Sequence, residues 1–254
     1  MTQRECEALL GFALRVGSRM VECGAEAWRA ENTMQRLFRA YGLEVMDTHV
    51  IATQAGATVR DDKGHLYSVT RTIDPLATNV DLEHLEAINA TARWICTYPP
   101  SVWDLPDKPE ETLRPWKRLE LLGYLIVGAV FALFFGGGPL EAVFSALIGA
   151  VIFALDHVRY LHRQNRVIYT LFAFFVSGVL ARVVGLVFPS VAVDVIMIGD
   201  VMIFIPGLSV VNGVRELFYA DILTGLYRIV EALLGTGAIA LGFALALMLG
   251  GGLG

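Results

Sequence analysis

Lysine is absent from the second half of this 254-residue chain, and charge of either sign is sparse there. Residues 119–254 contain six Arg and eight acidic residues, whereas residues 1–118 contain 14 of the 20 basic and 17 of the 25 acidic residues. With 55% hydrophobic residues and a mean hydropathy of +0.56, the chain is too apolar for an ordinary soluble domain. The composition therefore predicts a polar N-terminal domain followed by a membrane domain.

Motifs of catalysis and cofactor binding are also absent. The chain has no P-loop, no nucleophile elbow and no HExxH motif, and its five histidines lack metal-ligand spacing. We therefore expect no enzymatic activity, no cofactor and no metal site. The absence of a basic cluster with interleaved aromatic residues argues against nucleic acid as a partner.

Cysteine is scarce, and the N-terminus lacks the pattern of a signal peptide. Cys6, Cys23 and Cys96 all lie in the polar half, and an odd number without CxxC spacing argues against a disulfide framework or a zinc site. This usage fits a reducing compartment. No basic segment followed by an apolar one opens the chain, so we expect no cleaved signal peptide.

Five apolar stretches approach the length of about 20 residues that crossing a bilayer requires. They are roughly Leu119–Phe135, Leu140–Val158, Val167–Phe188, Val191–Val211 and Ile229–Leu249. The sequence therefore predicts a membrane protein with a five-helix transmembrane α-bundle over residues 119–254.

The loops between these stretches predict the orientation. The basic segments "RPWKR" and "RYLHRQNR", together with Arg215 and Arg228, alternate with the turns "GGGP" and "FPS", which carry no Lys or Arg. Every basic loop thus falls on one side, which the positive-inside rule assigns to the cytoplasm. We expect a multi-pass protein of the inner membrane, with a cytoplasmic N-terminal domain and the C-terminus outside.

The polar half reads as a small cytoplasmic α+β domain over residues 1–96. Apolar residues recur at helical spacing in residues 9–21 and 27–41, and Val45–Ala52 alternates like a strand. A hairpin with its turn at Asp61–Gly64 follows, and then a helix that Asp81 caps. Residues 97–118 form a linker that holds five of the nine prolines, which makes it stiff.

An acid lies inside the fourth apolar stretch, "IMIGDVMIFIPGLSVVNGVREL". Asp200 is near the middle of the predicted span, where a charged group costs a few kcal/mol or more. Such an acid is either a substrate or proton site, or one half of a structural pair. Arg182, inside the third span, could pair with Asp200 or with Asp194. Alternatively, Arg182 binds an anion.

A helix break follows six residues after this acid. Proline removes a backbone hydrogen bond, so Pro206-Gly207 predicts an interruption of the fourth span. Transporters place such breaks at binding sites, where a new helix N-terminus faces an anion. Ser209 and Asn212 could cap that helix or contact a ligand; the alternative is a simple kink.

Two stretches resemble the ThrE-like threonine/serine exporter family. One is "GAEAWRAENTMQRLFRAYGLE", Gly24–Glu44, and the other is "IPGLSVVNGVRELFYADILTGLYRIVEA", Ile205–Ala232. They are similar to the family's GAE…R.E.T and PG…N..RD…GD..SG..R..EA segments. Glu216 stands where the family pattern has Asp, and Ala220-Asp221 where it has Gly-Asp. Order, spacing and the five-span layout extend the resemblance over nearly the whole chain.

The resemblance implies roles for a charged stretch after the fourth span. Arg215 would join the substrate or ion site, and Glu216, Asp221, Arg228 and Glu231 would line an inner gate. Read from the residues alone, the same stretch is a solvated cytoplasmic helix.

The resemblance also implies a partner. Single-chain members of the family carry a second hydrophobic half, whereas this sequence stops at Gly254. We therefore expect the N-terminal-half subunit of the split form, completed by a second small integral membrane protein. A homo-oligomer within this hetero-complex is compatible with that expectation.

Two functions follow. The first is a subunit of a secondary exporter driven by an ion gradient, since no ATP-binding motif is present, with protons as the expected coupling ion. Its substrate would be a threonine/serine-type amino acid, or a dicarboxylate such as succinate, which split members are linked to. An amino acid would use Asp200 for its ammonium group, whereas a dicarboxylate would use Arg182 or Arg215. The alternative is a membrane-anchored sensor or assembly protein with a ligand-binding cytoplasmic domain.

Overall fold

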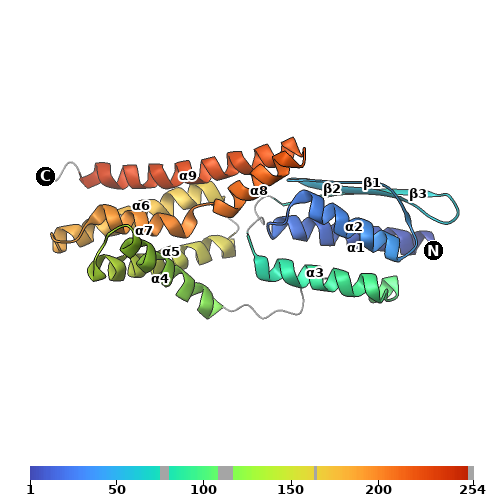
Figure 1. Cartoon of the computed structure of the whole chain (residues 1–254), viewed down its shortest axis with the longest axis horizontal. Helices are drawn as coiled ribbons and strands as arrows, with labels where there is room; N and C mark the ends of the chain where they lie inside the picture. Colours follow the sequence, from blue (N-terminus) through green and yellow to red (C-terminus); the bar gives the residue numbers. More distant parts are fainter. Residues whose placement is uncertain (75–79, 108–116, 163–164, 251–254) are drawn as a thin grey trace. The chain divides into compact units, whose positions relative to one another are not determined.

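A computed structural model describes residues 1–74, 80–107, 117–162 and 165–250. The chain divides into two compact units, which Figure 1 shows with their element labels. The N-terminal unit comprises residues 1–114 and 208–229, and the membrane unit comprises residues 115–207 and 230–254. Residues 208–229 thus group with the N-terminal unit, although the sequence analysis placed them within the transmembrane domain.

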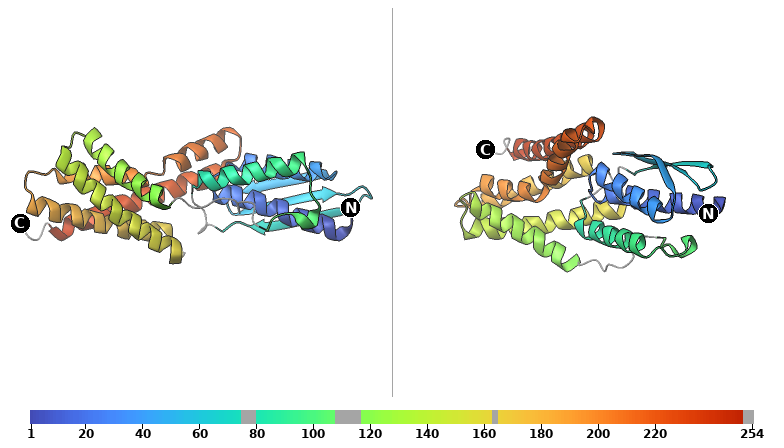
Figure 2. Two further views of the ribbon diagram at one scale, coloured as in Figure 1. Left: turned by 90° about the horizontal axis from the view of Figure 1, so that it is seen from below. Right: turned by 45° about the vertical axis from the view of Figure 1, so that its right-hand side comes forward.

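The N-terminal unit combines helices with one small antiparallel sheet in the order β1-β2-β3. Its first six elements are α1 (Gln3–Glu22), α2 (Ala27–Ala40), β1 (Glu44–Ile51), β2 (Gln54–Arg60), β3 (Leu66–Thr72) and α3 (Leu82–Thr97). The sheet packs on one side of the α1/α2 pair and α3 on the other, as Figures 1 and 2 show. The predicted α+β composition of this region is confirmed.

Local sequence signals explain where these elements begin. Thr2 and Glu5 form a capping box at the start of α1, and Asp81 caps α3 by accepting a hydrogen bond from the His84 backbone N–H at 3.0 Å. The hairpin turn at Asp61–Gly64 is also confirmed, since Arg60 pairs with Leu66.

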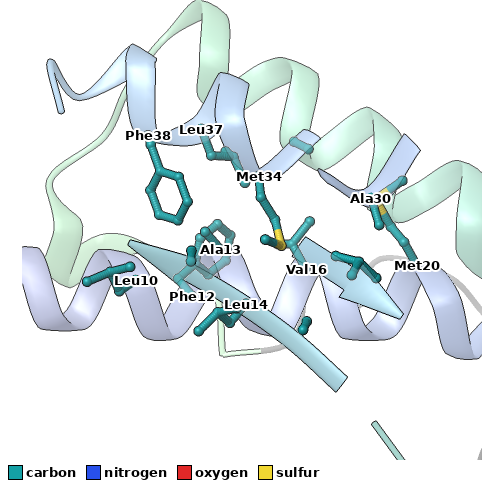
Figure 3. Close-up of a cluster of buried hydrophobic side chains, with 14 of the residues drawn as sticks. Leu10, Phe12, Ala13, Leu14, Val16, Met20, Ala30, Met34, Leu37 and Phe38 are labelled. Carbon is teal, nitrogen blue, oxygen red and sulfur yellow. The ribbon is translucent and has the colours of Figure 1, made fainter. Parts of the chain in front are cut away.

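The core of this unit lies between α1, α2 and the sheet (Figure 3). Met34 of α2 fills the space beside Gly17 of α1, where an added Cβ would come within 2.3 Å of the Met34 sulfur. Leu10, Phe12 and Phe38 are fully buried in the same cluster. Burial of such side chains contributes about 1.5–3 kcal/mol each, which fixes α2 firmly against α1.

Part of the predicted linker belongs to this core. A short 3₁₀ turn, η1 (Val102–Asp104), places Val102 and Leu105 against the buried cluster. Residues 108–116 of the predicted linker lie outside the described residues.

The membrane unit consists of helices. Its elements are α4 (Lys117–Phe134), α5 (Pro139–His162), α6 (Arg166–Val187), α7 (Val193–Phe204) and the part of α9 (Ile222–Gly250) that follows residue 229. Three segments are long and apolar enough to cross a membrane, namely Pro139–Val158, Arg166–Val187 and Ile222–Leu249.

The fourth predicted span is broken, and the first is short. α7 and α8 (Gly207–Phe218) pass the same test only as a pair, bent by 48° at Pro206. The apolar part of α4, Leu119–Phe134, is shorter than the others. The described part of the chain therefore supports three or four of the five predicted spans, and the helix break at Pro206 is confirmed.

Glycines let the helices of the membrane unit approach closely. A Cβ added to Gly242 of α9 would lie 2.5 Å from the Leu171 carbonyl oxygen of α6, and one on Gly199 of α7 would lie 3.0 Å from the Gly128 carbonyl oxygen of α4. Backbone atoms cannot move aside as flexible side chains do, so larger residues would separate these helices.

Candidate functional site

Asp200 of α7 is completely buried in the membrane unit. The Ser145 hydroxyl of α5 donates to its Oδ1 and the Ser177 hydroxyl of α6 donates to its Oδ2, both at 2.8 Å. Three helices therefore converge on one carboxyl group. Both serines are themselves buried, with 0% and 1% of their surface exposed, so the acid is shielded from bulk water in this conformation.

This arrangement satisfies the hydrogen bonds of Asp200 without offsetting its charge. A hydroxyl both donates and accepts, so Ser145 and Ser177 can serve the carboxylate and, after one of them rotates, the protonated acid. An ionised carboxylate inside an apolar region costs several kcal/mol when no cation accompanies it. The site is therefore suited to an acid that exchanges a proton or meets a cation during its working cycle.

The predicted partner of this acid is not in place. In the described residues Arg182 forms no ion pair with Asp200, whose two hydrogen bonds come from serines. Asp194, the alternative partner of Arg182, is exposed near the start of α7, and Arg182 is half-buried on α6. The structural pair proposed for Asp200 and Arg182 is thus absent from this structure.

The residues after the break have different surroundings. Pro206 and Ser209 are half-buried and Gly207 is exposed at the start of α8. The Asn212 side chain donates to the Gly24 carbonyl oxygen at 3.1 Å, so it contacts the α1–α2 turn rather than capping α8.

The two sequence stretches that resemble the exporter family meet in the N-terminal unit. Side chains of α8 and α9 hold the backbone of the segment Gly24–Ala27, which links α1 to α2. We call this contact the motif cluster; its side chains are those of Glu26, Asn212, Arg215, Glu216 and Arg228.

Glu216 caps a helix that is distant in sequence. The first turn of α2 receives no side-chain cap from Glu26, its N-cap residue, but the Ala27 backbone N–H donates to Glu216 Oε1 at 3.1 Å. A carboxylate at a helix N-terminus satisfies a free N–H and interacts favourably with the helix dipole. Arg228 balances its charge, with Nε 3.1 Å from Glu216 Oε2, and also donates to the Ala25 carbonyl oxygen at 2.5 Å.

Glu26 forms the second ion pair of the cluster. Its side chain is only 5% exposed and contacts both Arg215 and Arg29, the latter at 3.2 Å. Burial alone would raise the pKa of Glu26, but hydrogen bonds from its own backbone N–H and from the two arginines outweigh burial, so the pKa lies below its ordinary value. The interpretation of Arg215, Glu216 and Arg228 as part of a solvated helix is wrong for Glu216 and Arg228, which are 1% and 8% exposed.

Two further motif residues have local roles. Asp221 Oδ1 accepts a hydrogen bond from the Thr224 backbone N–H at 3.1 Å, which caps the start of α9. Glu231 lies one turn beyond Arg228 on α9 and is half-buried in the membrane unit. Gly213 and Gly225 allow α8 and α9 to touch, because a Cβ on Gly225 would lie 2.7 Å from the Gly213 carbonyl oxygen.

Ala220, in the turn between α8 and α9, has a left-handed backbone with φ of +64°. The family pattern has glycine here, and glycine adopts this conformation without the clash that a Cβ causes. We predict that Ala220→Gly raises the free energy of unfolding by about 1 kcal/mol. Ala90→Gly, in the exposed interior of α3, is the control and should lower it by about 1 kcal/mol. Denaturant unfolding of both variants measures these changes. A change in the free energy of unfolding in the same direction for both variants would contradict the explanation.

A cavity of about 320 Å³ adjoins the motif cluster. It lies between α2, β1 and the α8–α9 turn, and its wall includes Glu31, Glu216 and Asp221 together with the rings of Trp28 and Tyr219. The two ring centroids are 5.4 Å apart. We call this the acidic pocket, because Glu31 and Asp221 line it together with Glu216, whose charge Arg228 balances, against one imidazole, that of His49.

Burial raises the pKa of Glu31, although the Val50 backbone N–H donates to its Oε1 at 2.8 Å. A cation beside such a buried carboxyl group stabilises its ionised form. The acidic pocket therefore has the chemistry to hold an ammonium group, with the aromatic rings contributing a cation–π interaction of about 0.5–2 kcal/mol.

Sequence analysis missed the serines that hold Asp200, and it missed Glu31, Trp28 and Tyr219 of the acidic pocket. Ser145 and Ser177 carry one signal, since each is a hydroxyl inside an otherwise apolar span. Glu31 and Trp28 lie on a helix face that reads as ordinary surface. Only the fold brings them to residues 216–221.

The architecture is that of a multi-pass membrane protein with a polar α+β unit, and within the described residues none of the polar clusters has the arrangement of a hydrolytic or redox centre. A family model described as "Putative threonine/serine exporter", ThrE, matches residues 11–250. The chain therefore belongs to the ThrE family, which is a family of transporters rather than enzymes. Comparison with curated proteins and with solved structures gave no match.

Proposed function

We propose that this chain is a subunit of a secondary exporter that moves a threonine- or serine-type amino acid out of the cytoplasm, coupled to protons. The observation that carries the proposal is Asp200, a buried acid of α7 where α5, α6 and α7 converge, whose partners among the described residues are two hydroxyls and no cation. An acid in such surroundings inside a transporter is suited to carrying the coupling proton or meeting the substrate ammonium group.

The acidic pocket favours an amino acid over a dicarboxylate as substrate. Its carboxyl groups attract an ammonium group and repel a dianion, and it lies against the motif cluster through Glu216. Arg215, one of the two cations that a dicarboxylate would use, is already paired with Glu26. We infer that the pocket takes the substrate from the cytoplasm before it reaches the membrane unit.

Export from cells tests this function. Cells that express the chain together with its partner should release preloaded threonine or serine, and release should depend on the proton gradient. Glu31→Gln keeps the bond from Val50 and removes the charge, so it should weaken release at low cytoplasmic substrate while the protein remains folded. Release of succinate but not of threonine would overturn the amino-acid proposal. Release of neither would favour the sensor or assembly alternative.

We further propose that a second small integral membrane protein completes the transporter, as the family resemblance implies. The chain expressed alone should give no efflux, and co-expression with a four- or five-span membrane protein encoded beside it should restore efflux. Affinity purification of the chain should then recover both proteins. Full efflux from the chain alone would contradict this prediction.

We also propose that the protein lies in the inner membrane with its N-terminal unit in the cytoplasm. Two exposed serines offer a matched test, one at the α6–α7 turn and one after α3. In a Cys96→Ser background, Ser190→Cys should react with a membrane-impermeant maleimide in intact cells, and Ser101→Cys should react only after lysis. The reverse pattern would invert the orientation.

A further inference from the structure

A second cavity of the N-terminal unit has the opposite charge. It lies between α2 and α3 and has a volume of about 430 Å³, and the described residues of its wall include three arginines and no acidic residue. Arg29 and Arg36 come from α2 and Arg93 from α3, so positive charge faces the cavity from both helices. We call this cavity the basic groove.

Two of these arginines have no carboxylate partner. Arg29 pairs with Glu26, whereas neither Arg36 nor Arg93 forms an ion pair within the described part of the chain. Like charges that face one cavity repel each other, so an anion between them would relieve this cost.

The other polar groups of the groove narrow the choice of ligand. The Thr33 and Thr97 hydroxyls each donate to a carbonyl of their own helix at 2.9 Å, and the Asn89 amide does so too. The donors that remain for a ligand are mainly the guanidinium groups, which bind carboxylate and phosphate oxygens through paired N–H groups. Trp28, which is 39% exposed, supplies a flat apolar wall.

We propose that the basic groove is a binding site for a small organic dianion, either a dicarboxylate or a phosphomonoester, and that it is separate from the acidic pocket. The volume is within the range of small-molecule sites. Arg36 and Arg93 bind the two negative charges, and the body of the ligand lies against Trp28. Arg29 connects the groove to the motif cluster, since its guanidinium contacts Glu26, which also pairs with Arg215. A dianion in the groove competes with Glu26 for Arg29 and so acts as an effector.

Binding to the purified full-length chain in a neutral detergent tests this site. Calorimetric titration with succinate and with glycerol phosphate, at low and at moderate salt, should show binding of at least one, and threonine should not bind there. The double variant Arg36→Gln/Arg93→Gln should weaken that binding by about tenfold or more, because two charge-assisted contacts are lost. Both residues are exposed, so the variant should keep the wild-type melting temperature.

The control removes the same charge elsewhere. Arg39→Gln/Arg71→Gln changes two exposed arginines outside the groove and should bind both probes as the wild type does. Equal weakening in the two double variants, or no binding of either probe to the wild type, would overturn the proposal. The phosphate headgroup of a lipid has the same chemistry, so the titration is repeated in nanodiscs with and without anionic lipid. Loss of soluble-probe binding only with anionic lipid would assign the groove to a headgroup and overturn the small-molecule site.

Discussion

Replacing Asp200 by Asn should abolish proton-coupled efflux while leaving the protein folded and inserted. Asn matches the size of Asp and still offers one oxygen to a serine, and the other hydroxyl can rotate to accept from the new amide group. The change removes only the group that binds and releases a proton. If Asp200 is the coupling acid, we expect a loss of efflux of about 100-fold or more, since general acid–base groups contribute on this scale. Efflux of labelled threonine at several external pH values measures it.

Asp194 offers the matched control for this experiment. It is an exposed acid on the same helix, so Asp194→Asn should leave efflux and its pH dependence nearly unchanged. Asp200→Asn combined with Arg182→Gln should remain inactive, because no ion pair joins the two residues in this structure. Normal pH-dependent efflux in Asp200→Asn would remove Asp200 from the coupling mechanism. Recovery in the double variant would instead make Asp200 a structural partner of Arg182.

The position of Asp200 was predictable from the sequence, but its partners were not. An acid within an apolar run stands out by composition alone, and proline chemistry predicts the break at Pro206 equally well. Ser145 and Ser177 come from two other helices, and only the way those helices pack shows which hydroxyls reach the acid. A salt bridge to Arg182 was a reasonable expectation from charge, but helix rotation decides such contacts.

Residues 208–229 show a different limit of sequence analysis. The apolar run continues past Pro206, so hydropathy extended the fourth span to Val211, whereas these residues group with the N-terminal unit. The contacts responsible join residues almost 190 positions apart, as between Ala27 and Glu216. A polar helix face can be covered by water or by a complementary polar segment. Periodicity alone does not distinguish these cases, which is why Glu216 and Arg228 read as solvated.

The ion pair between Glu216 and Arg228 leads to the largest expected effect on stability. Both side chains are nearly inaccessible, and each also bonds the backbone of the α1–α2 turn. Arg228→Gln should lower the free energy of unfolding of the N-terminal unit by about 3–5 kcal/mol, because it leaves a buried carboxylate without its counter-charge. The Trp28 ring lies against that of Tyr219, with centroids 5.4 Å apart, beside this pair, so tryptophan fluorescence during denaturant unfolding follows the loss of structure there.

Two controls separate the burial of this pair from the loss of any ion pair. Arg60→Gln breaks the pair with Glu44, whose side chains are 38% and 61% exposed, and should cost no more than about 1 kcal/mol. Adding Glu216→Gln to Arg228→Gln removes the uncompensated charge, and the amide oxygen can still accept from the Ala27 N–H. The double variant should therefore recover a large part of the lost stability. If the double variant instead loses as much unfolding free energy as the two single variants together, the pair acts through packing and not through charge. Glu216 would then cap α2 without any need for Arg228.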